Sequence, residues 1–585
     1  MSAIATPQRP APASDAPSAL HVAGTRSGIP RWAALWLATL LTLTIATRLA
    51  DPTGWLGSDD AAYYSAAEHI LTGTPITRLH HHYARMAIIL PIAASVAIFG
   101  HTTWAVALPM LIASIVCVIL VVILGRVVWD WWVGLLAGTI VSLLPYFRIL
   151  STTAFPDVHV CMWSTAAMLL AVAALRTRGR KSPVLLFVAS GFATGSAVSA
   201  KVFAASVVIG IAALVWQEAA RTPDRNRSRL RRRLPTAIAA FACGGLLFLL
   251  IEGFFYSHAA NDFLFSLHAH EHSQAGAPDM VADDDPLRLG ILPMIGNRMT
   301  LLLYPSVSGW GIIGAFFWPA VLMTLLFNHA GRGLALWAAT TYLLVAFMPV
   351  SFAEGYQPYP IFHGRHILPA CVPFALCFAW SIRSFFSLVQ RESWTRVAWP
   401  AFAAAVVAIS LVNPRELNGF RDRPTGRVGT AISQIVAKTN WDADRPIVMT
   451  PSVYWRYRIL FPEPFRSRLR VAADPDSPTW WRDTTVDIVA RSGPLPAPNR
   501  AYLIVTPRQL AGEAETWDYD VTLPRDERSA WQQVPPTVTM VRYANRDIGP
   551  ALSGDVRATP IVMLMGGADS DQPAIAERNK PFFRP

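Results

Sequence analysis

Apolar stretches long enough to cross a bilayer recur along the first 413 residues, with short polar loops between them. A transmembrane helix needs about 20 mostly apolar residues. The first stretch, 32–48, has no small-residue cleavage site after it, so we expect a retained helix and not a signal peptide. The others lie at 103–128, 134–149, 158–175, 185–200, 202–217, 235–256, 308–327, 333–352, 366–388 and 397–413. The pattern predicts an all-α polytopic membrane protein with about 11 to 13 spans.

The loops between these stretches differ in charge, and the difference predicts which side they face. Loops rich in Arg and Lys are expected on the cytoplasmic side. They lie at 176–181, 221–233, 332 and 391–396. All four share that side only if the apolar stretch 86–99 does not cross, so we predict a juxtamembrane or re-entrant helix there. The segments predicted to lie on the outer side are then 51–85, 155–157, 257–300, 353–365 and the residues after 414.

Composition agrees with this class of protein. Hydrophobic residues make up 53% of the chain and charged residues 15%, with a mean hydropathy of +0.35. The net charge of +12 would suit a nucleic-acid partner, but the basic residues are spread over short loops, so we expect none. Residues 1–30 are rich in Pro, Ala and Ser, which predicts a disordered cytoplasmic tail. We expect an integral protein of the cytoplasmic (inner) membrane, with a multi-pass domain at 31–413.

The last part of the chain, 414–585, has a different pattern. It is polar and rich in Pro, with short apolar runs at 446–450, 501–506, 537–543 and 560–565. Alternating helix and strand signals predict a small extracytoplasmic α/β domain. It contains no cysteine, because all five cysteines fall in predicted spans, so this domain uses no disulfide.

Three acids at the predicted outer boundary are the leading candidates for catalysis. Asp59 and Asp60 follow the first span, and Asp157 begins a later one after Pro156. Each can be explained as a helix N-cap, since Asp is a good cap. Ionisable groups beside lipid are costly unless they are solvated or paired, which favours a functional role. Asp59 and Asp60 are followed on helical spacing by Tyr63, Tyr64 and Glu68.

Cations at the same boundary are candidates for binding a lipid phosphate. Arg and Lys suit this role through charge-assisted hydrogen bonds. A lysine between two spans can also simply extend toward the interface. Histidines at 80–82 can bind a metal ion, but consecutive residues project in different directions, so we expect a single-ion site less than an anion site; a divalent metal remains an open cofactor. The candidate substrate- or phosphate-binding residues are Arg85, Lys201, Arg365, His366 and His81.

Two further polar features have competing explanations. In the loop 257–300, His268, Glu271 and His272 share one helical face, and the loop is either a mobile polar segment or a metal or acceptor site. Glu252 lies inside a span, where it should pair with a cation or line a cavity. The chain has no P-loop, dinucleotide fingerprint, nucleophile elbow or zincin motif, which excludes an obvious nucleotide-driven pump.

These motifs, in their order along the chain, carry a family resemblance that spans about residues 32–390. Asp59-Asp-Ala-Ala-Tyr63 with Ala66 and Ala67 resembles the Asp-Glu-x-x-Tyr…Ala signature of the first outer loop of GT-C glycosyltransferases of the protein mannosyltransferase and aminoarabinose transferase type. Phe-Gly at 99–100, Asp157, Gly195…Lys201 and Arg365-His-Ile-Leu-Pro369 resemble later family segments. The chain departs from the family at Asp60, where Glu is usual, at His366, where Tyr is usual, and at His80–Arg85, which stands in place of Arg-Pro-Pro.

The resemblance implies an inverting glycosyltransferase that moves a sugar from a polyprenyl-phosphate donor to a lipid, glycan or protein acceptor outside the membrane. Asp59 would be the general base, Asp157 would assist, and substitution of Asp60 should cost less activity. We also expect the two neighbouring carboxylates to raise each other's pKa. The alternatives are a transporter or flippase of a lipid-linked substrate, which often shows repeated halves and ionisable groups near mid-membrane, and a membrane-anchored sensor.

Overall fold

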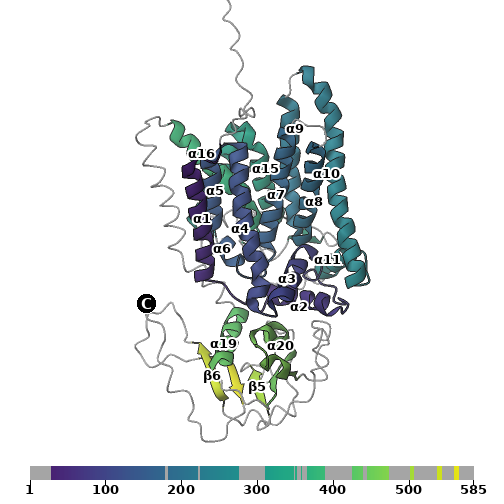
Figure 1. The fold of residues 1–585 in the computed structure, drawn as a ribbon, viewed down its shortest axis with the longest axis vertical. Coiled ribbons are helices and arrows are strands. Elements are labelled where there is room, and N and C mark those ends of the chain that lie inside the picture. The colour runs from purple at the N-terminus through teal and green to yellow at the C-terminus, as the bar shows by residue number, and fades with distance from the viewer. Residues whose placement is uncertain are drawn as a thin grey trace, which may run out of the picture.

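The structure is a computed structural model, and it describes residues 28–177, 182–221, 224–275, 310–347, 349–351, 357–358, 365–388, 424–438, 445–472, 501–505, 536–542 and 559–565. These residues form a mostly helical bundle with strands near the C-terminal end of the chain (Figure 1). The predicted span 397–413, the tail 1–27 and the acids at 283–285 lie outside the described residues.

Seven described helices are long and apolar enough to cross a membrane. They include or overlap α1 (Arg31–Ala50), α4 (Thr103–Val128), α7 (Asp157–Arg176), α8 (Ser182–Ala200), α10 (Asp224–Ala259), α15 (Arg332–Phe347) and α16 (Cys371–Leu388). Three shorter apolar helices, α5 (Trp131–Leu143), α9 (Ser206–Arg221) and α14 (Phe317–Phe327), occupy three more predicted spans. The described part of the chain therefore shows fewer full-length spans than the expected 11 to 13, because a 13-residue helix such as α5 extends only about 20 Å.

The helices of the bundle differ in how deeply they are buried, and two of them pack closely through small residues. The apolar windows of α7 and α16 are 61% and 67% buried, whereas those of α1 and α10 are 22% and 17% buried. The first two are thus central, and the last two present apolar side chains outward, as lipid-facing helices do. Helices α8 and α10 approach closely at Gly191 and Gly244, where a Cβ on either would overlap the backbone of the other helix.

Short helices cover one end of the bundle (Figure 1). They are α2 (Asp59–Thr72), α3 (Met86–Phe99), α6 (Pro145–Leu150) and α11 (Phe265–Ala275). Helix α3 has 14 residues and extends only about 21 Å, well short of a bilayer core. Helix α5, which occupies a predicted span, is equally short, so the statement that 86–99 does not cross the membrane stays a prediction.

The C-terminal elements lie beyond this end and include a five-stranded sheet of order β4-β3-β5-β7-β6. Strand β3 (Ile447–Met449) is parallel to β4 (Leu469–Val471) and β5 (Tyr502–Val505), while β7 (Thr559–Met565) is antiparallel to β5 and to β6 (Pro536–Arg542). The accompanying helices are α19 (Pro424–Lys438) and α20 (Pro451–Tyr457). Strands β1 (Pro349–Ser351) and β2 (Gln357–Pro358) pair antiparallel elsewhere. The five-stranded sheet and these helices lie within the segment for which an α/β domain is predicted.

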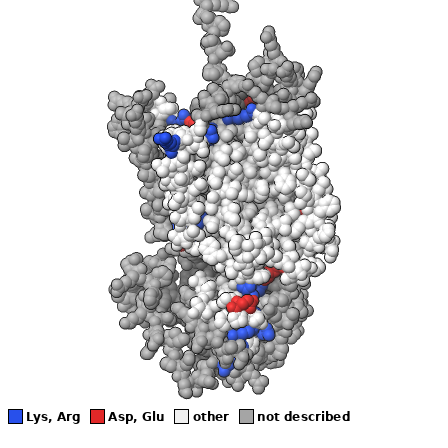
Figure 2. All heavy atoms as spheres, viewed as in Figure 1, with Lys and Arg blue, Asp and Glu red and all other residues white. Residues whose placement is uncertain are grey.

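Charged residues lie mainly at the two ends of the bundle. Figure 2 shows a broad band of uncharged surface over the helices, with Lys and Arg gathered above it and with acids and Arg below it, near α2 and the C-terminal elements. An uncharged band between two charged zones is the surface expected of a membrane-spanning bundle. The protein is therefore an integral membrane protein, and the candidate acids lie at the end that carries α2.

Candidate active site

Asp60 is buried at the start of α2, where it stabilises the preceding turn. Its Oδ2 accepts a hydrogen bond from the Leu56 amide at 2.7 Å, and its Oδ1 accepts from the amides of Ser58 at 2.6 Å and Ala61 at 3.0 Å. Burial raises the pKa of this carboxyl to about 6, despite the opposing effect of the amide hydrogen bonds. Both carboxylate oxygens thus accept hydrogen bonds from backbone amides, as the capping explanation of this residue expects.

Asp59 faces Arg365 and His82 instead. Its Oδ2 lies 3.4 Å from Nη1 of Arg365 and 3.6 Å from Nε2 of His82. Burial raises the pKa of Asp59, but the charge of Arg365 and the contact with His82 outweigh it and hold the pKa well below its usual range. The expectation that the two carboxylates raise each other's pKa is therefore wrong for Asp59, because Arg365 and His82 face this carboxylate and not Asp60.

Asp157 and Lys201 form a second, deeper pair. Nζ of Lys201 donates to Oδ1 of Asp157 at 2.7 Å, and the two side chains are only 11% and 1% exposed. Asp157 is the first residue of α7, whose N-cap is Pro156, so it makes no capping hydrogen bond. Lys201 follows α8 and turns inward to this pair. Neither the capping explanation of Asp157 nor the interfacial explanation of Lys201 holds.

Arg365 and Arg85 connect the two pairs into one cluster. Arg365 stacks over the Phe155 ring at 5.0 Å, close to the start of α7, while it pairs with Asp59 of α2. Arg85 donates to the hydroxyl of buried Tyr63, and its charge acts on both Asp59 and Lys201, as that of Arg365 does. The structure thus brings together five of the predicted residues: Asp59, Asp157, Arg85, Lys201 and Arg365. His366 is buried next to Arg365 in the chain.

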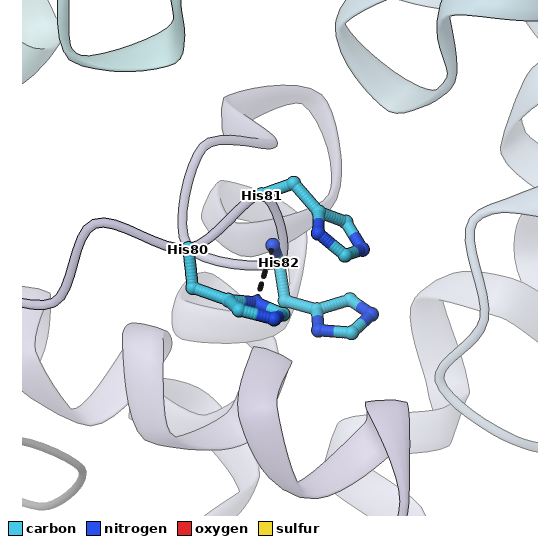
Figure 3. Close-up of side chains that lie close together, drawn as sticks. All are labelled: His80, His81 and His82. Carbon is cyan, nitrogen blue, oxygen red and sulfur yellow. Dashed lines mark hydrogen bonds between the residues drawn. The ribbon is translucent and has the colours of Figure 1, made fainter. Parts of the chain in front are cut away.

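The three histidines at 80–82 lie in a turn with their rings side by side (Figure 3). Their ring centroids are 4.1 to 4.6 Å apart, and the backbone amide of His82 donates to Nδ1 of His80 at 3.3 Å. The expected divergence of consecutive side chains does not occur, because the turn does not have the alternation of a strand. One ligand atom of each residue lies within 4.8 Å of the others, so a transition-metal cation is one ligand this group can hold.

The same histidines are unsuited to supply positive charge. Burial and neighbouring positive charges lower the pKa of His80 to about 2 and also lower the pKa of His81 and of His82. The three imidazoles are therefore neutral near pH 7. This corrects the expectation of His81 as a cation for a phosphate; a neutral imidazole still offers one N–H.

A cavity of about 630 Å³ lies beside these histidines, between α8, α10 and α11. Its walls are mostly apolar, with Ser199, Glu252, Ser266, His270 and Glu271 among the polar lining residues. His270 lies 6.3 Å, ring to ring, from His81. Glu252 accepts a hydrogen bond from Ser199 and lines the cavity, which is the second of the two roles expected for it. His268 pairs with Asp262 at 2.7 Å and is exposed.

Sequence reasoning missed two parts of the site. The cavity combines residues of three helices, and of its lining residues the sequence pointed to Glu252 and Gly195. Arg456 and Arg458, from the C-terminal segment, contact the α2 region. Nothing in their local sequence distinguishes them from the other arginines of that segment.

Comparison with known proteins shows similarity to a family model and to solved structures. Residues 87–249 match the family model of dolichyl-phosphate-mannose-protein mannosyltransferases. No curated protein shows a significant sequence match to the chain. The crystal structure of ArnT from Cupriavidus metallidurans in the apo state is similar, with a TM-score of 0.52 and 12% identity over 92% of this chain and 99% of that one.

Two further solved structures are similar at a lower level. ArnT bound to undecaprenyl phosphate gives a TM-score of 0.49 and 13% identity, over 83% of this chain and 97% of that one. Archaeal oligosaccharyltransferase AglB from Archaeoglobus fulgidus, in complex with an inhibitory peptide and a dolichol-phosphate, gives 0.45 and 12%, over 82% of this chain and 70% of that one.

The fold is that of a polytopic membrane protein whose acids and cations converge at one end of the helical bundle. The match over 87–249 and the similarity to the ArnT structure agree with this fold.

Proposed function

We propose that this protein transfers a sugar from a polyprenyl-phosphate donor to a lipid, glycan or protein acceptor at the outer face of the inner membrane, with inversion at the anomeric carbon. The observation that carries the proposal is the cluster in which the carboxylates of Asp59 and Asp157 meet the cations Arg365, Lys201 and Arg85. Carboxylates suit an attacking hydroxyl, and cations suit a departing phosphate. The family matched over 87–249 is named for a lipid-phosphate sugar donor.

The chemistry requires one bond to form as another breaks. The acceptor hydroxyl oxygen attacks the anomeric carbon, and the bond from that carbon to the phosphate oxygen breaks on the opposite side. The hydroxyl proton passes to a carboxylate, for which Asp59 is our candidate, and the polyprenyl phosphate leaves with the electron pair. Arg365 and Lys201 stabilise its negative charge. No nucleotide takes part in these steps.

A donor phosphate bound at this site would compete with Asp59 for the guanidinium of Arg365. In the structure Arg365 pairs with Asp59, and that pairing keeps the pKa of Asp59 low and its carboxylate a weak base. A phosphate that draws Arg365 away would raise the pKa of Asp59 and strengthen it as a proton acceptor. Donor binding would thus activate the base.

The cavity between α8 and α10 fits the lipid part of such a donor. It is mostly apolar, it lies in the half of the bundle nearest α2, and its polar residues gather near α11 and the histidines. A polyprenyl chain would enter these apolar walls from the equally apolar bilayer, so it would lose no favourable solvation there. The neutral histidines would then lie near the sugar or the phosphate.

A transporter or flippase is the second candidate, favoured by one observation: Glu252, an acid within a spanning helix, lines the cavity. Two assays on the purified protein in vesicles separate the candidates. A transferase consumes the donor and labels an acceptor, whereas a flippase moves intact donor across the bilayer. Mass spectrometry of glycans, lipids and envelope proteins in a deletion strain would identify the missing product.

Arg365→Ala should raise the donor concentration needed for half-maximal rate by about tenfold or more. A charge-assisted hydrogen bond is worth roughly 1.5–3 kcal/mol, which corresponds to this factor. Because Arg365 lowers the pKa of Asp59, its removal should also move the acidic limb of the kcat/KM profile to higher pH. Steady-state kinetics across pH measure both, and an unchanged donor dependence in a folded variant would remove Arg365 from the site.

The C-terminal domain should lie outside the cytoplasm. A reporter that is active only in the periplasm, fused after Pro585, should be active, because the basic loops 176–181 and 221–233 are expected at the opposite, cytoplasmic face. A reporter active only in the cytoplasm is the matched control and should be silent. The reverse pattern would contradict both the outer location of 414–585 and the parity of the spans.

A further inference from the structure

The α2 helix, which carries Asp59 and Asp60, is held at both ends by one short segment of the C-terminal domain. This segment is residues 455–458, from the end of α20 and the start of the 3-10 helix Arg458–Leu460. In Figure 1, α20 lies directly beside α2, although about 390 residues separate them in sequence.

At the N-terminal end, the two segments exchange hydrogen bonds. Nη1 of Arg456 donates to the carbonyl of Gly57 at 2.5 Å, and Nε1 of Trp55 donates to the carbonyl of Arg456 at 2.6 Å. Gly57 has φ of +64°, and a Cβ at this position would overlap the ring of Tyr457. Only glycine accommodates both the backbone conformation and the ring, so Tyr457 packs directly on the turn before Asp59.

Toward the C-terminal end, an ion pair between a buried arginine and a partly buried glutamate makes the contact. The guanidinium of Arg458 pairs with the carboxylate of Glu68, lies over the ring of Tyr64 at 4.9 Å, and is 2% exposed. Buried ion pairs add little net stability, but breaking one by removing a single partner is costly. The pair between Arg458 and Glu68 therefore fixes the position of α2 more than it adds to the stability of the fold.

The acids of the site lie between these two contacts. The amides of Leu56 and Ser58, which hold Asp60, flank the carbonyl that Arg456 binds. Asp59 follows the same turn, and its pairing with Arg365 of the bundle at 3.4 Å leaves little room for displacement.

We propose that Arg456, Tyr457 and Arg458 are positioning residues that hold α2 so that Asp59 faces Arg365. We call their contacts with Trp55, Gly57 and Glu68 the α2 clamp. The C-terminal domain is then part of the active-site scaffold and not an independent module. The catalytic consequence rests on the proposed transferase function, whereas the mechanical coupling does not.

The kinetic test uses Arg456→Met and Arg458→Met. Each should lower kcat by about tenfold to hundredfold, since a displacement of about 1 Å can cost a factor of 100, while the donor KM changes little because Arg365 and Lys201 are untouched. Arg456→Lys should restore part of kcat by donating to Gly57. The losses of kcat caused by Glu68→Gln and Arg458→Met should not add in the double variant, because both substitutions break the same ion pair. Arg470→Met is the matched control, since Arg470 is an exposed arginine of the same domain whose hydrogen bonds to described residues go to nearby backbone carbonyls.

A measurement without turnover tests the clamp itself. Spin labels at Leu71→Cys on α2 and Glu463→Cys beyond α20, in a Cys243→Ser background, should give one narrow distance distribution. The Arg456→Met/Arg458→Met pair should broaden it. Unbroadened distances, or broadened distances with unchanged kcat, would overturn the proposal. A wild-type protein inactive with every polyprenyl-phosphate sugar would count against the transferase function alone, since the distances would still decide whether the clamp exists.

Discussion

Asp59→Asn should lower sugar transfer by about 10²- to 10⁴-fold, the typical loss when a general base is removed. The amide keeps the size of the side chain and can still accept one hydrogen bond from Arg365, so the protein should still fold, but the loss of the ion pair should lower its thermal midpoint. The loss should appear in kcat, with acceptor and donor binding largely preserved. Radiolabelled or mass-spectrometric transfer assays on purified protein measure it.

Two neighbouring acids provide controls for this result. Asp51→Asn removes a partly exposed ion pair with Arg148, 3.3 Å long, and should leave transfer unchanged, since surface pairs contribute little. Asp60→Asn should cost less transfer than Asp59→Asn but should lower the thermal midpoint, because an amide cannot accept all three backbone hydrogen bonds. Wild-type transfer by Asp59→Asn would make Asp157 the leading base. Full activity of both α2 variants would argue against a glycosyltransferase.

Lys201→Met should destabilise the protein by about 3–5 kcal/mol, because it leaves a buried carboxylate without its partner. Asp157 is 1% exposed and its bond to Lys201 is 2.7 Å long, so water cannot readily replace the ammonium. The double variant Asp157→Asn/Lys201→Met carries no unpaired charge and should recover most of this stability. It should remain impaired in transfer, because both the carboxylate and the phosphate contact are lost.

Thermal unfolding in detergent, set beside a transfer assay, separates the two effects. A purely structural pair would let the double variant regain activity together with stability. Equal stability of the single and double variants would instead show that the pair is solvated. The stability comparison holds even if the transferred sugar is not identified, since it depends only on burial.

Much of the membrane architecture can be predicted from the sequence, because spanning helices are local. The apolar runs that form α1, α4, α7 and α8 can be recognised from their length and hydrophobicity, whereas the prediction that 86–99 does not cross rests on the charges of distant loops. Among the described residues, the apolar run 134–149 does not form one full-length helix, because α5 ends at Leu143 and a proline starts the next helix.

The sequence by itself determined the residue types of the site: an acid pair after the first span, an acid at the start of α7, and cations in the outer loops. Only the tertiary structure decided their roles. Arg365 reaches Asp59 across 306 positions, and Arg458 reaches Glu68 across 390. The pKa values of the two adjacent acids therefore differ: that of Asp59 is low and that of Asp60 is raised to about 6. The physical reason is that a pKa depends on burial and on the charges nearest in space, and neither follows from neighbours in the chain.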